Sequence, residues 1–424
     1  MKRFSKSYKL SDKDKFIKKA ISLSKKKSDF ILLNSNNFSD TYDAIIAYDK
    51  LSSIKSINNS LNKLDNYIKE KNDWVFGFLT YDLKNEIEIL NDNNIDVFDL
   101  PNVYFFQPKT IWLIKNNIAT IISINKDALI NDWNEIISIP NYINENEKNN
   151  IELFFRNTKY EYIDKVKKIK ERIMRGDCYE MNFCFDIFND NKTIDPYSTY
   201  NKLNEYTKSP MSTFLKIEDL FLISSSPERF LKKIDNIITS EPIKGTAKRG
   251  ASKSEDKLNV KKLLSSPKEL SENHMIVDLV RNDLSKIAKK GSVIVKKLNE
   301  LNTFKRVHQL VSSIKAIINP NTKFSHIIRA TFPMGSMTGA PKIESMKIID
   351  EYESTKRGLY SGSVGYIKPN MDFDFNVVIR SIIYSKKHKK INISVGSAIT
   401  FKSNADSEYD ECLLKAEPMI KSLK

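Results

Sequence analysis

Helical and strand-like hydrophobic patterns alternate along the second half of this chain, and this mixture constrains the fold most. Residues 162–176 space their apolar side chains as one face of a helix and end on a glycine. Residues 376–385 and 390–400 are rich in β-branched residues and are separated by a basic turn, which predicts an antiparallel hairpin. We therefore predict an α+β or mixed α/β fold that contains antiparallel sheet.

The length of the chain bears on its division into domains. With 424 residues, it is too long for one small core and suggests two domains or one large α/β unit. Residues 141–150, "NYINENEKNN", form the most polar stretch in the middle of the chain and are typical of a linker. We place a boundary near residue 150, which gives an N-terminal region of residues 1–150 and a second region of residues 151–424.

The charge of the chain is strongly basic, with a formal net value of +16. A basic nucleic-acid-binding protein would concentrate this charge on one face and bind DNA with a steep salt dependence. The lysines are instead spread along the whole chain, and short clusters such as residues 25–27 are usually solvated. Nucleic-acid binding is therefore kept only as a remote alternative, and no nucleic-acid partner is expected.

The cysteines and the N-terminus bear on the compartment. Cys178, Cys184 and Cys412 form no CxxC pair and have no metal-ligand spacing, which suits a reducing compartment. The N-terminus has no apolar core of a signal peptide, and no stretch approaches the roughly 18 apolar residues of a membrane span. We expect a cytoplasmic chain with no membrane partner.

A pair of glutamates lies near the start of a predicted helix over residues 266–291. Ser266 is a good N-cap, Glu269 completes a capping box, and Gly291 is expected to close the helix. Glu269 and Glu272 share the edge of a face that is otherwise apolar. The capping box explains Glu269 by itself, but it does not explain Glu272.

A second helix, predicted within residues 404–420, repeats this spacing with Glu408 and Glu411. The plain interpretation is an exposed face on which Glu411 pairs with Lys415. The functional interpretation is that two helices each bring a carboxylate pair to one divalent ion. Oxygen ligands without a histidine or cysteine cluster favour Mg²⁺ over Zn²⁺.

Three further features suggest anion binding or catalysis. The loop "EPIKGTAKRG", residues 241–250, holds Lys244 beside Gly245, and this lysine could be a solvated charge, a phosphate clamp or a nucleophile. Gly335 and Ser336 precede a helix that opens with Pro341, where free N–H groups could bind an anion. Arg380, expected in a strand, is either an edge arginine facing water or a clamp for a carboxylate.

Taken together, these motifs resemble a known family. "SSSPERFL", "EPIKGTAKRG", "SENHMIVDLVRNDL", "RVHQLVSSIKA", "FPMGSMTGAPKIESM", "RGLYSGSVGY", "VVIRSIIY" and "ADSEYDECLLKA" occur in the order found in chorismate-utilising enzymes. That family includes anthranilate synthase component I, aminodeoxychorismate synthase component I, isochorismate synthase and salicylate synthase. The resemblance covers roughly residue 160 to the C-terminus and implies a large fold rich in antiparallel sheet and flanked by helices.

The resemblance also implies a role for each matching position. Chorismate is a dianion, so cations, arginine, lysine and backbone amides would offset the cost of its desolvation. His308 and Thr246 match residues near the departing C4 hydroxyl. The substrate-binding positions implied are Gly245, Gly335, Ser336, Tyr360, Arg380, Gly396, Ala398 and Lys415. The implied Mg²⁺ ligands are Glu272 and Glu411, with Glu269 and Glu408 behind them.

The residue at position 244 separates two branches of the resemblance. Anthranilate synthases usually have alanine here, whereas many aminodeoxychorismate synthases have a lysine that attacks ring C2. The resemblance thus implies that Lys244 is a nucleophile, with a pKa expected to be lowered by burial near a cation, and that Glu228 is the general acid on the C4 hydroxyl. Ammonia would then add at C4 to give 4-amino-4-deoxychorismate, a precursor of p-aminobenzoate in folate synthesis. The alternative is anthranilate synthase component I.

Several departures from the family pattern qualify this expectation. Ammonia-using members usually have glutamine where this chain has Glu180, and a hypothesis is that Glu180 orients ammonia. Ala398 replaces a glycine, and Asn34 replaces an acidic residue of a motif for tryptophan feedback. No glutaminase nucleophile is evident, so a separate glutamine amidotransferase subunit is expected to supply ammonia.

Overall fold

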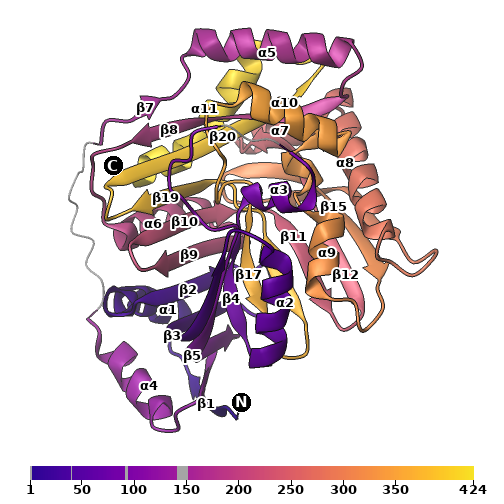
Figure 1. Ribbon diagram of the computed structural model, residues 1–424. Coiled ribbons are helices and arrows are strands. Elements are labelled where there is room, and N and C mark those ends of the chain that lie inside the picture. Colours follow the sequence, from indigo (N-terminus) through magenta and orange to yellow (C-terminus); the bar gives the residue numbers. More distant parts are fainter. Residues whose placement is uncertain (1, 40, 91–93, 141–150) are drawn as a thin grey trace.

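The strands of this protein form one continuous network of antiparallel pairs. The computed structural model describes residues 2–39, 41–90, 94–140 and 151–424, and within them every ladder between named strands is antiparallel (Figure 1). One half of the network runs through β8 (Glu180–Asn189), β20 (Lys390–Thr400), β19 (Ser381–Ser385), β10 (Leu220–Ser226), β9 (Met211–Ile217), β2 (Asp29–Asn34) and β3 (Ala44–Ser56).

The other half of the network continues from β3. It passes through β5 (Val103–Lys115), β4 (Val75–Leu79), β17 (Ser363–Ile367), β18 (Phe373–Asn376), β11 (Arg229–Ile234), β12 (Ile237–Glu241) and β15 (Val307–Ile317). Strand β15 also pairs with β13 (Ile243–Lys248) and β14 (Ile294–Thr303). Short additions are β1 (Phe4–Lys9), β6 (Ile118–Ser123), β7 (Phe154–Phe155) and β16 (Gly339–Ala340).

The two regions expected on either side of residue 150 share this network. Strand β2 pairs with β9, and β4 pairs with β17, so strands from before residue 141 lie between strands from after residue 150. The expected boundary itself falls within residues 141–150, outside the described residues. The division into 1–150 and 151–424 stays a prediction.

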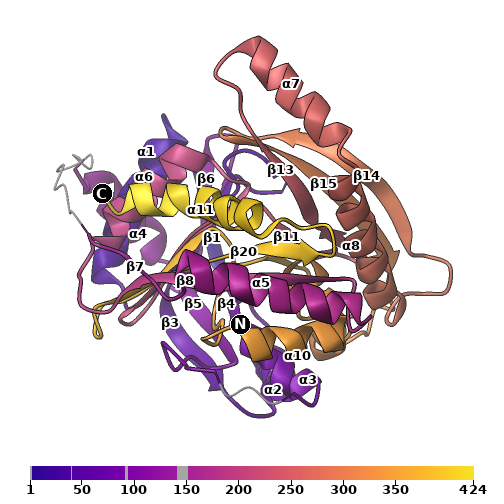
Figure 2. The same ribbon diagram turned by 90° about the horizontal axis from the view of Figure 1, so that it is seen from above.

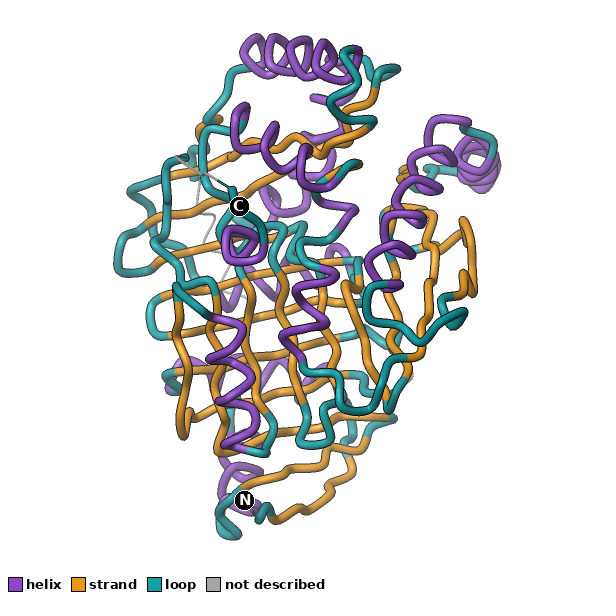
Figure 3. The backbone as a smooth tube through the Cα atoms, turned by 45° about the vertical axis from the view of Figure 1, so that its right-hand side comes forward, coloured by secondary structure: helices purple, strands orange, loops and turns teal. Residues whose placement is uncertain are grey.

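Both faces of the central strands are buried, because successive apolar side chains point alternately into two different clusters. On β2, Phe30 and Leu32 belong to one apolar cluster, while Ile31 between them belongs to another. Successive side chains of a strand point to opposite faces, so each cluster collects every second residue. Figure 3 shows the consequence, with two layers of strands that cross one another and helices outside them.

One group of helices covers the β8–β20 face. Helix α11 (Ala405–Ser422) packs on β20, α5 (Lys159–Met174) and α6 (Pro196–Thr207), while α10 (Lys342–Tyr352) packs on β8 (Figures 1 and 2). Helix α5 begins with a capping box at Thr158 and buries Tyr162, Val166 and Ile169, which confirms the helix expected from its spacing. The expected hairpin is also confirmed, as β19 and β20.

The remaining helices lie on the other strands. Helix α8 (Pro267–Ser285) packs on β13 and β15, and α7 (Lys253–Leu264) stands beside β13 at the edge seen in Figure 2. Helix α1 (Lys13–Leu23) packs against α4 (Ala128–Ser138), and α2 (Ser60–Lys71) packs against α9 (Phe324–Thr331). Short turns are α3 (Lys84–Ile87), η1 (Ser24–Lys26), η2 (Tyr81–Leu83) and η3 (Gly335–Met337).

Helix α8 differs from its expected extent. It starts with Ser266 as N-cap and Pro267 in the first turn, as predicted, but it ends at Ser285 and not at Gly291. The chain leaves the helix because Ala288 bridges to Ile318, beyond the end of β15, and the Lys289 N–H donates to the Ile317 carbonyl. Pairing with this strand replaces the last helical turns. No helix in the described ranges is long and apolar enough to cross a bilayer.

Candidate active site

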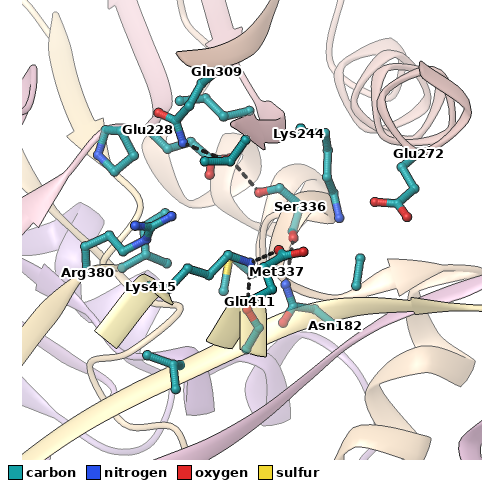
Figure 4. Close-up of a pocket in the computed structure, with 18 of the residues that line it drawn as sticks. Asn182, Glu228, Lys244, Glu272, Gln309, Ser336, Met337, Arg380, Glu411 and Lys415 are labelled. Atoms are coloured by element: carbon teal, nitrogen blue, oxygen red, sulfur yellow. Dashed lines mark hydrogen bonds and ion pairs between the residues drawn. The ribbon is translucent and has the colours of Figure 1, made fainter. Parts of the chain in front are cut away.

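A buried cavity of about 90 Å³ lies where β13, the β8–β20 pair, α8 and α11 meet (Figure 4). It brings together residues as far apart in the sequence as Asn182 and Lys415. Nearly all of the residues singled out from the sequence line it. They are Glu228, Lys244, Gly245, Thr246, Glu269, Glu272, Ser336, Tyr360, Arg380, Gly396, Ala398, Glu408, Glu411 and Lys415.

Lys244 is held by Glu180. The Lys244 Nζ donates to Glu180 Oε1 at 2.5 Å, and both side chains are buried. Burial disfavours the ammonium, but the carboxylates of Glu180, Glu272 and Glu228 outweigh it and raise the pKa of Lys244. The expected lowering of this pKa was wrong, because three carboxylates flank the amine. The hypothesis that Glu180 orients ammonia also meets a competing contact here, since Glu180 already binds Lys244.

Glu228 lies in the same cavity and is suited to carry a proton near neutral pH. Burial raises the pKa of Glu228 to about 7, although a hydrogen bond from Ser336 and the charge of Lys244 act to lower it. Ser336 Oγ donates to Glu228 Oε1 at 2.6 Å. Ser336 therefore contacts the predicted acid directly, a contact that the sequence did not indicate.

Four carboxylates project into the cavity from α8 and α11. The Lys268 ammonium contacts two of them, with Nζ at 2.6 Å from Glu408 Oε1 and 3.8 Å from Glu272 Oε1. Burial, together with Glu180 and Glu269, raises the pKa of Glu272 to about 8 against the opposing charges of Lys244 and Lys268. The capping box at Glu269 is only half formed. The Glu269 N–H donates to Ser266 Oγ at 3.4 Å, but the Glu269 carboxylate faces the cavity instead of returning to the backbone of Ser266.

The carboxylates fit a divalent cation in kind. Glu272 Oε1 and Glu408 Oε2 are buried and have no hydrogen-bond partner, so these lone pairs are available to a hard cation. No group of three or more histidine, cysteine, aspartate or glutamate side chains is arranged for ligation within the described ranges. The donor atoms match Mg²⁺, while their present positions accommodate Lys268.

The opposite wall of the cavity is basic. Lys415 Nζ bonds Glu411 Oε1 at 2.6 Å and the Gly396 carbonyl at 2.8 Å. Although burial opposes it, Lys415 lowers the pKa of Glu411. Arg380 lies just before β19, not in a strand as expected, and has φ of 52°. A left-handed arginine is uncommon, and such conformations cluster at ligand sites.

Ala398 lies in an ordinary strand, at a position where the family resemblance implies a glycine. It is paired with Asn182 in the β20–β8 ladder and is not among the residues with positive φ. Its N–H is therefore presented as in an ordinary strand. Alanine is therefore accommodated at this position without a left-handed backbone.

Two predicted site residues lie outside the cavity lining. His308 is turned away on β15, where its ring bonds Thr303 Oγ1 and Asp256 Oδ1 at 2.9 Å each. Its neighbour Gln309 faces the cavity instead, because adjacent strand residues point to opposite sides. Gly335 serves packing, since a Cβ there would lie 2.6 Å from Leu279 Cδ2.

The anion site expected at the start of the helix that follows Pro341, now α10, does not form part of the cavity. Gly339 and Ala340 pair with β8, and the cavity is lined by Ser336 and Met337 of η3 rather than by the N-terminus of α10. The sequence did not indicate four other polar or charged residues that line the cavity. These are Asn182, Lys268, Gln309 and Ser394. Two of them could have been predicted from their neighbours. Gln309 follows His308 on a strand, where side chains alternate between the two faces, and Lys268 precedes Glu269 on a helix.

A buried arginine supports the floor of the cavity. The Arg357 guanidinium donates to both carboxylate oxygens of Glu353, at 2.6 and 2.9 Å. It also donates to the carbonyls of Met337 at 2.6 Å and Asn182 at 2.8 Å. One side chain thus fixes η3 and β8 relative to each other.

Comparisons with known proteins show which proteins this chain is similar to. The family model described as chorismate binding enzyme matches residues 18–421. The aminodeoxychorismate synthase component 1 of Bacillus subtilis (strain 168) is 31% identical over 363 residues, which are 82% of this chain and 76% of that protein. The protein of the same name from Escherichia coli (strain K12) is 37% identical over 267 residues, 63% of this chain and 58% of that protein.

Other curated relatives are longer than this chain. It is 40% identical over 260 residues to the chloroplastic aminodeoxychorismate synthase of Arabidopsis thaliana, which covers 60% of the chain but 28% of that protein. The chain thus spans between about a quarter and three fifths of several of the curated relatives that it matches.

Solved structures share the fold. Anthranilate synthase component I from Streptococcus pneumoniae superposes with a TM-score of 0.77 at 26% identity, covering 88% of this chain and 91% of that one. The menaquinone-specific isochorismate synthase of Escherichia coli gives 0.79 at 15% identity, covering 100% and 94%. The expected sheet-rich fold is thereby confirmed, and the chain belongs to the family of chorismate binding enzymes.

Proposed function

We propose that this chain is component I of an aminodeoxychorismate synthase, a transferase that converts chorismate and ammonia to 4-amino-4-deoxychorismate. The observation that carries this proposal is the presence of an amine and an acid in one cavity, Lys244 and Glu228. Anthranilate synthases, by the family resemblance, usually have alanine at position 244. The name shared by the curated relatives supports the same reaction.

The charges of the cavity suit chorismate, which carries two carboxylates. Arg380 and Lys415 would hold them, with the N–H groups of Gly396 and Ala398 nearby on β20. A second cavity of about 450 Å³ adjoins the first and shares Thr246, Arg380 and Lys415 with it. Its walls also carry basic side chains, which would draw an anionic substrate inward. These are Lys248, Arg249, Lys305, Arg306 and Lys421.

The proposed reaction has two displacements. The neutral Lys244 amine attacks ring C2, the ring double bonds shift, and the C4–O bond breaks while Glu228 gives its proton to the departing hydroxyl, which leaves as water. Ammonia then attacks C4, the double bonds shift back, and the C2–N bond breaks to release the Lys244 amine. The proton lost by the new ammonium group returns to Glu228. The net change is chorismate plus ammonia to product plus water.

A Mg²⁺ ion would be held by Glu272 and Glu411, with Glu269 and Glu408 behind them. When bound, it would neutralise negative charge on the substrate carboxylate in a site of low polarity. The carboxylates fit this role because two of their buried oxygens, Glu272 Oε1 and Glu408 Oε2, have no hydrogen-bond partner.

Metal binding can be measured apart from activity. Mg²⁺ at about a hundredfold excess over its Kd is expected to raise the free energy of unfolding by about 2.7 kcal/mol. Glu272→Gln should lose this gain, because the amide removes one anionic ligand. Asp278→Asn, at an exposed position on the same helix, should keep it. An equal gain in Glu272→Gln, with sodium chloride at matched ionic strength as blank, would argue against a site at Glu272.

The proposed source of ammonia is a separate glutamine amidotransferase subunit. "Component 1" in the names of two relatives supports a partner subunit for this chain too. Three buried free cysteines suit a reducing, cytoplasmic compartment. Neither nucleic acid nor a membrane is proposed as a partner. Conversion of the product to p-aminobenzoate would require another enzyme.

The rival function is that of anthranilate synthase component I, favoured by the similarity to the Streptococcus pneumoniae structure. Purified chain should be incubated with chorismate, Mg²⁺ and an ammonium salt, and the products separated by mass. We expect a product in which an amino group replaces one hydroxyl of chorismate. Anthranilate fluorescence in the absence of any lyase would overturn the proposal.

A further inference from the structure

Glu180 and Lys244 form a closed ion pair behind the cavity wall. Lys244 Nζ lies 2.5 Å from Glu180 Oε1, and the two side chains are 9% and 1% exposed. Lys244 lines the cavity, whereas Glu180 does not. The second oxygen, Glu180 Oε2, is buried and has no hydrogen-bond partner. Glu180 therefore acts on the cavity through Lys244.

The backbone holds both members of the pair rigidly. Glu180 begins β8 between two strands, paired with Thr400 of β20 and Ala340 of β16. Gly339 lets β16 approach this closely, because a Cβ at residue 339 would lie 2.1 Å from the Glu180 carbonyl oxygen. The positive φ of Gly245 accompanies a register shift in β13 beside Lys244. The contact is thus a product of strand geometry and not of a mobile loop.

A buried amine and carboxylate in contact can share one proton. Ammonium with carboxylate and amine with carboxylic acid have the same net charge, so the proton can change sides without any exchange with water. The other charged groups facing Lys244 are Glu228, before β11, and Glu269 and Glu272, on α8. None of these three has a hydrogen bond or ion pair with Lys244, so Glu180 is its direct partner.

We propose that Glu180 is a positioning residue that accepts the proton of Lys244 and so frees the amine inside the closed site. The inference rests on the proposed reaction, in which Lys244 attacks ring C2. The proton moves from Nζ to Glu180 Oε1 before the N–C2 bond forms and the C4–O bond breaks. It returns when the C2–N bond breaks and the amine is released. Glu180 itself forms no bond to the substrate.

The test measures how fast the protein gains mass when it is incubated with chorismate in the absence of ammonia. This rate is compared between the Glu180→Gln variant and the unsubstituted chain. Glutamine keeps the size and the oxygen acceptor of glutamate but cannot take the proton. In that variant the amine must lose its proton to solvent, so the ratio of the two rates should change about tenfold per pH unit between about pH 5 and 6.5. Taking the ratio cancels the pH dependence that the two proteins share, such as the protonation of Glu228. The window lies below the raised pKa of Glu272, on which Glu180 also acts.

The controls keep each outcome decisive. Glu180→Asp retains a carboxylate, so the ratio of its rate to that of the unsubstituted chain should not vary with pH, even if it is lower throughout. Lys244→Arg should gain no mass, because the guanidinium stays protonated. A pH-independent ratio for Glu180→Gln overturns the inference, as does an absent adduct in the unsubstituted chain. Product formation from chorismate and ammonium salt, measured in parallel, reports separately on the proposed synthase activity.

Discussion

Replacing Glu228 by glutamine is expected to lower kcat by about 10²- to 10⁴-fold at pH 6, the range usual for loss of a general acid. Glu228 is buried, accepts a hydrogen bond from Ser336, and has a pKa raised to about 7 by burial. It is therefore largely protonated below pH 7 and loses its proton as the pH rises through that value. The unsubstituted enzyme should lose activity about tenfold per pH unit above pH 7.

The pH profile separates this role from a structural one. The amide cannot titrate, so the Glu228→Gln variant should lack the decline near pH 7. Its stability should not fall at pH 8, because ionisation of a buried carboxyl is unfavourable and the amide avoids it. Glu241→Gln, which alters a partly exposed partner of Arg229, should leave kcat within about twofold of the unsubstituted value. A Glu228→Gln variant with unchanged kcat and an unchanged profile would rule out Glu228 as the acid.

Replacing Arg357 by methionine is expected to lower the free energy of unfolding by about 3–5 kcal/mol. The substitution leaves the Glu353 carboxylate buried without its bidentate partner. It also frees the carbonyls of Met337 and Asn182 that line the floor of the cavity, so kcat/KM should fall as well. Chemical denaturation and steady-state kinetics would measure the two effects.

A double substitution provides the control. Arg357→Met with Glu353→Gln removes both charges, so the stranded carboxylate no longer contributes to the loss. The double variant should unfold at a higher denaturant concentration than Arg357→Met alone. If it is no more stable, the cost does not come from an unpaired buried charge.

Much of the site could be predicted because its residues lie in short motifs with fixed local geometry. The spacing of Glu269 and Glu272 placed both carboxylates on one side of α8, and the same spacing held for Glu408 and Glu411 on α11. The hairpin of β19 and β20 followed from its β-branched runs and basic turn. These are local consequences of helical and strand periodicity.

What could not be predicted depends on contacts between distant segments. The pairing of Lys244 with Glu180 joins residues 64 positions apart, and it reversed the expected direction of the Lys244 pKa. His308 and Gln309 differ by one position, so only the register of β13 on β15 shows which of them faces the cavity. The early end of α8 likewise follows from pairing beyond the end of β15.

The most direct test of the central claim is the intact mass of the chain after incubation with chorismate and Mg²⁺ in the absence of ammonia. If Lys244 attacks ring C2 and the hydroxyl leaves as water, the mass should rise by that of chorismate less one water. The gain should disappear on adding an ammonium salt, and it should be absent from Lys244→Ala. The same mass gain in Lys244→Ala, or no gain in the unsubstituted chain, would contradict the account.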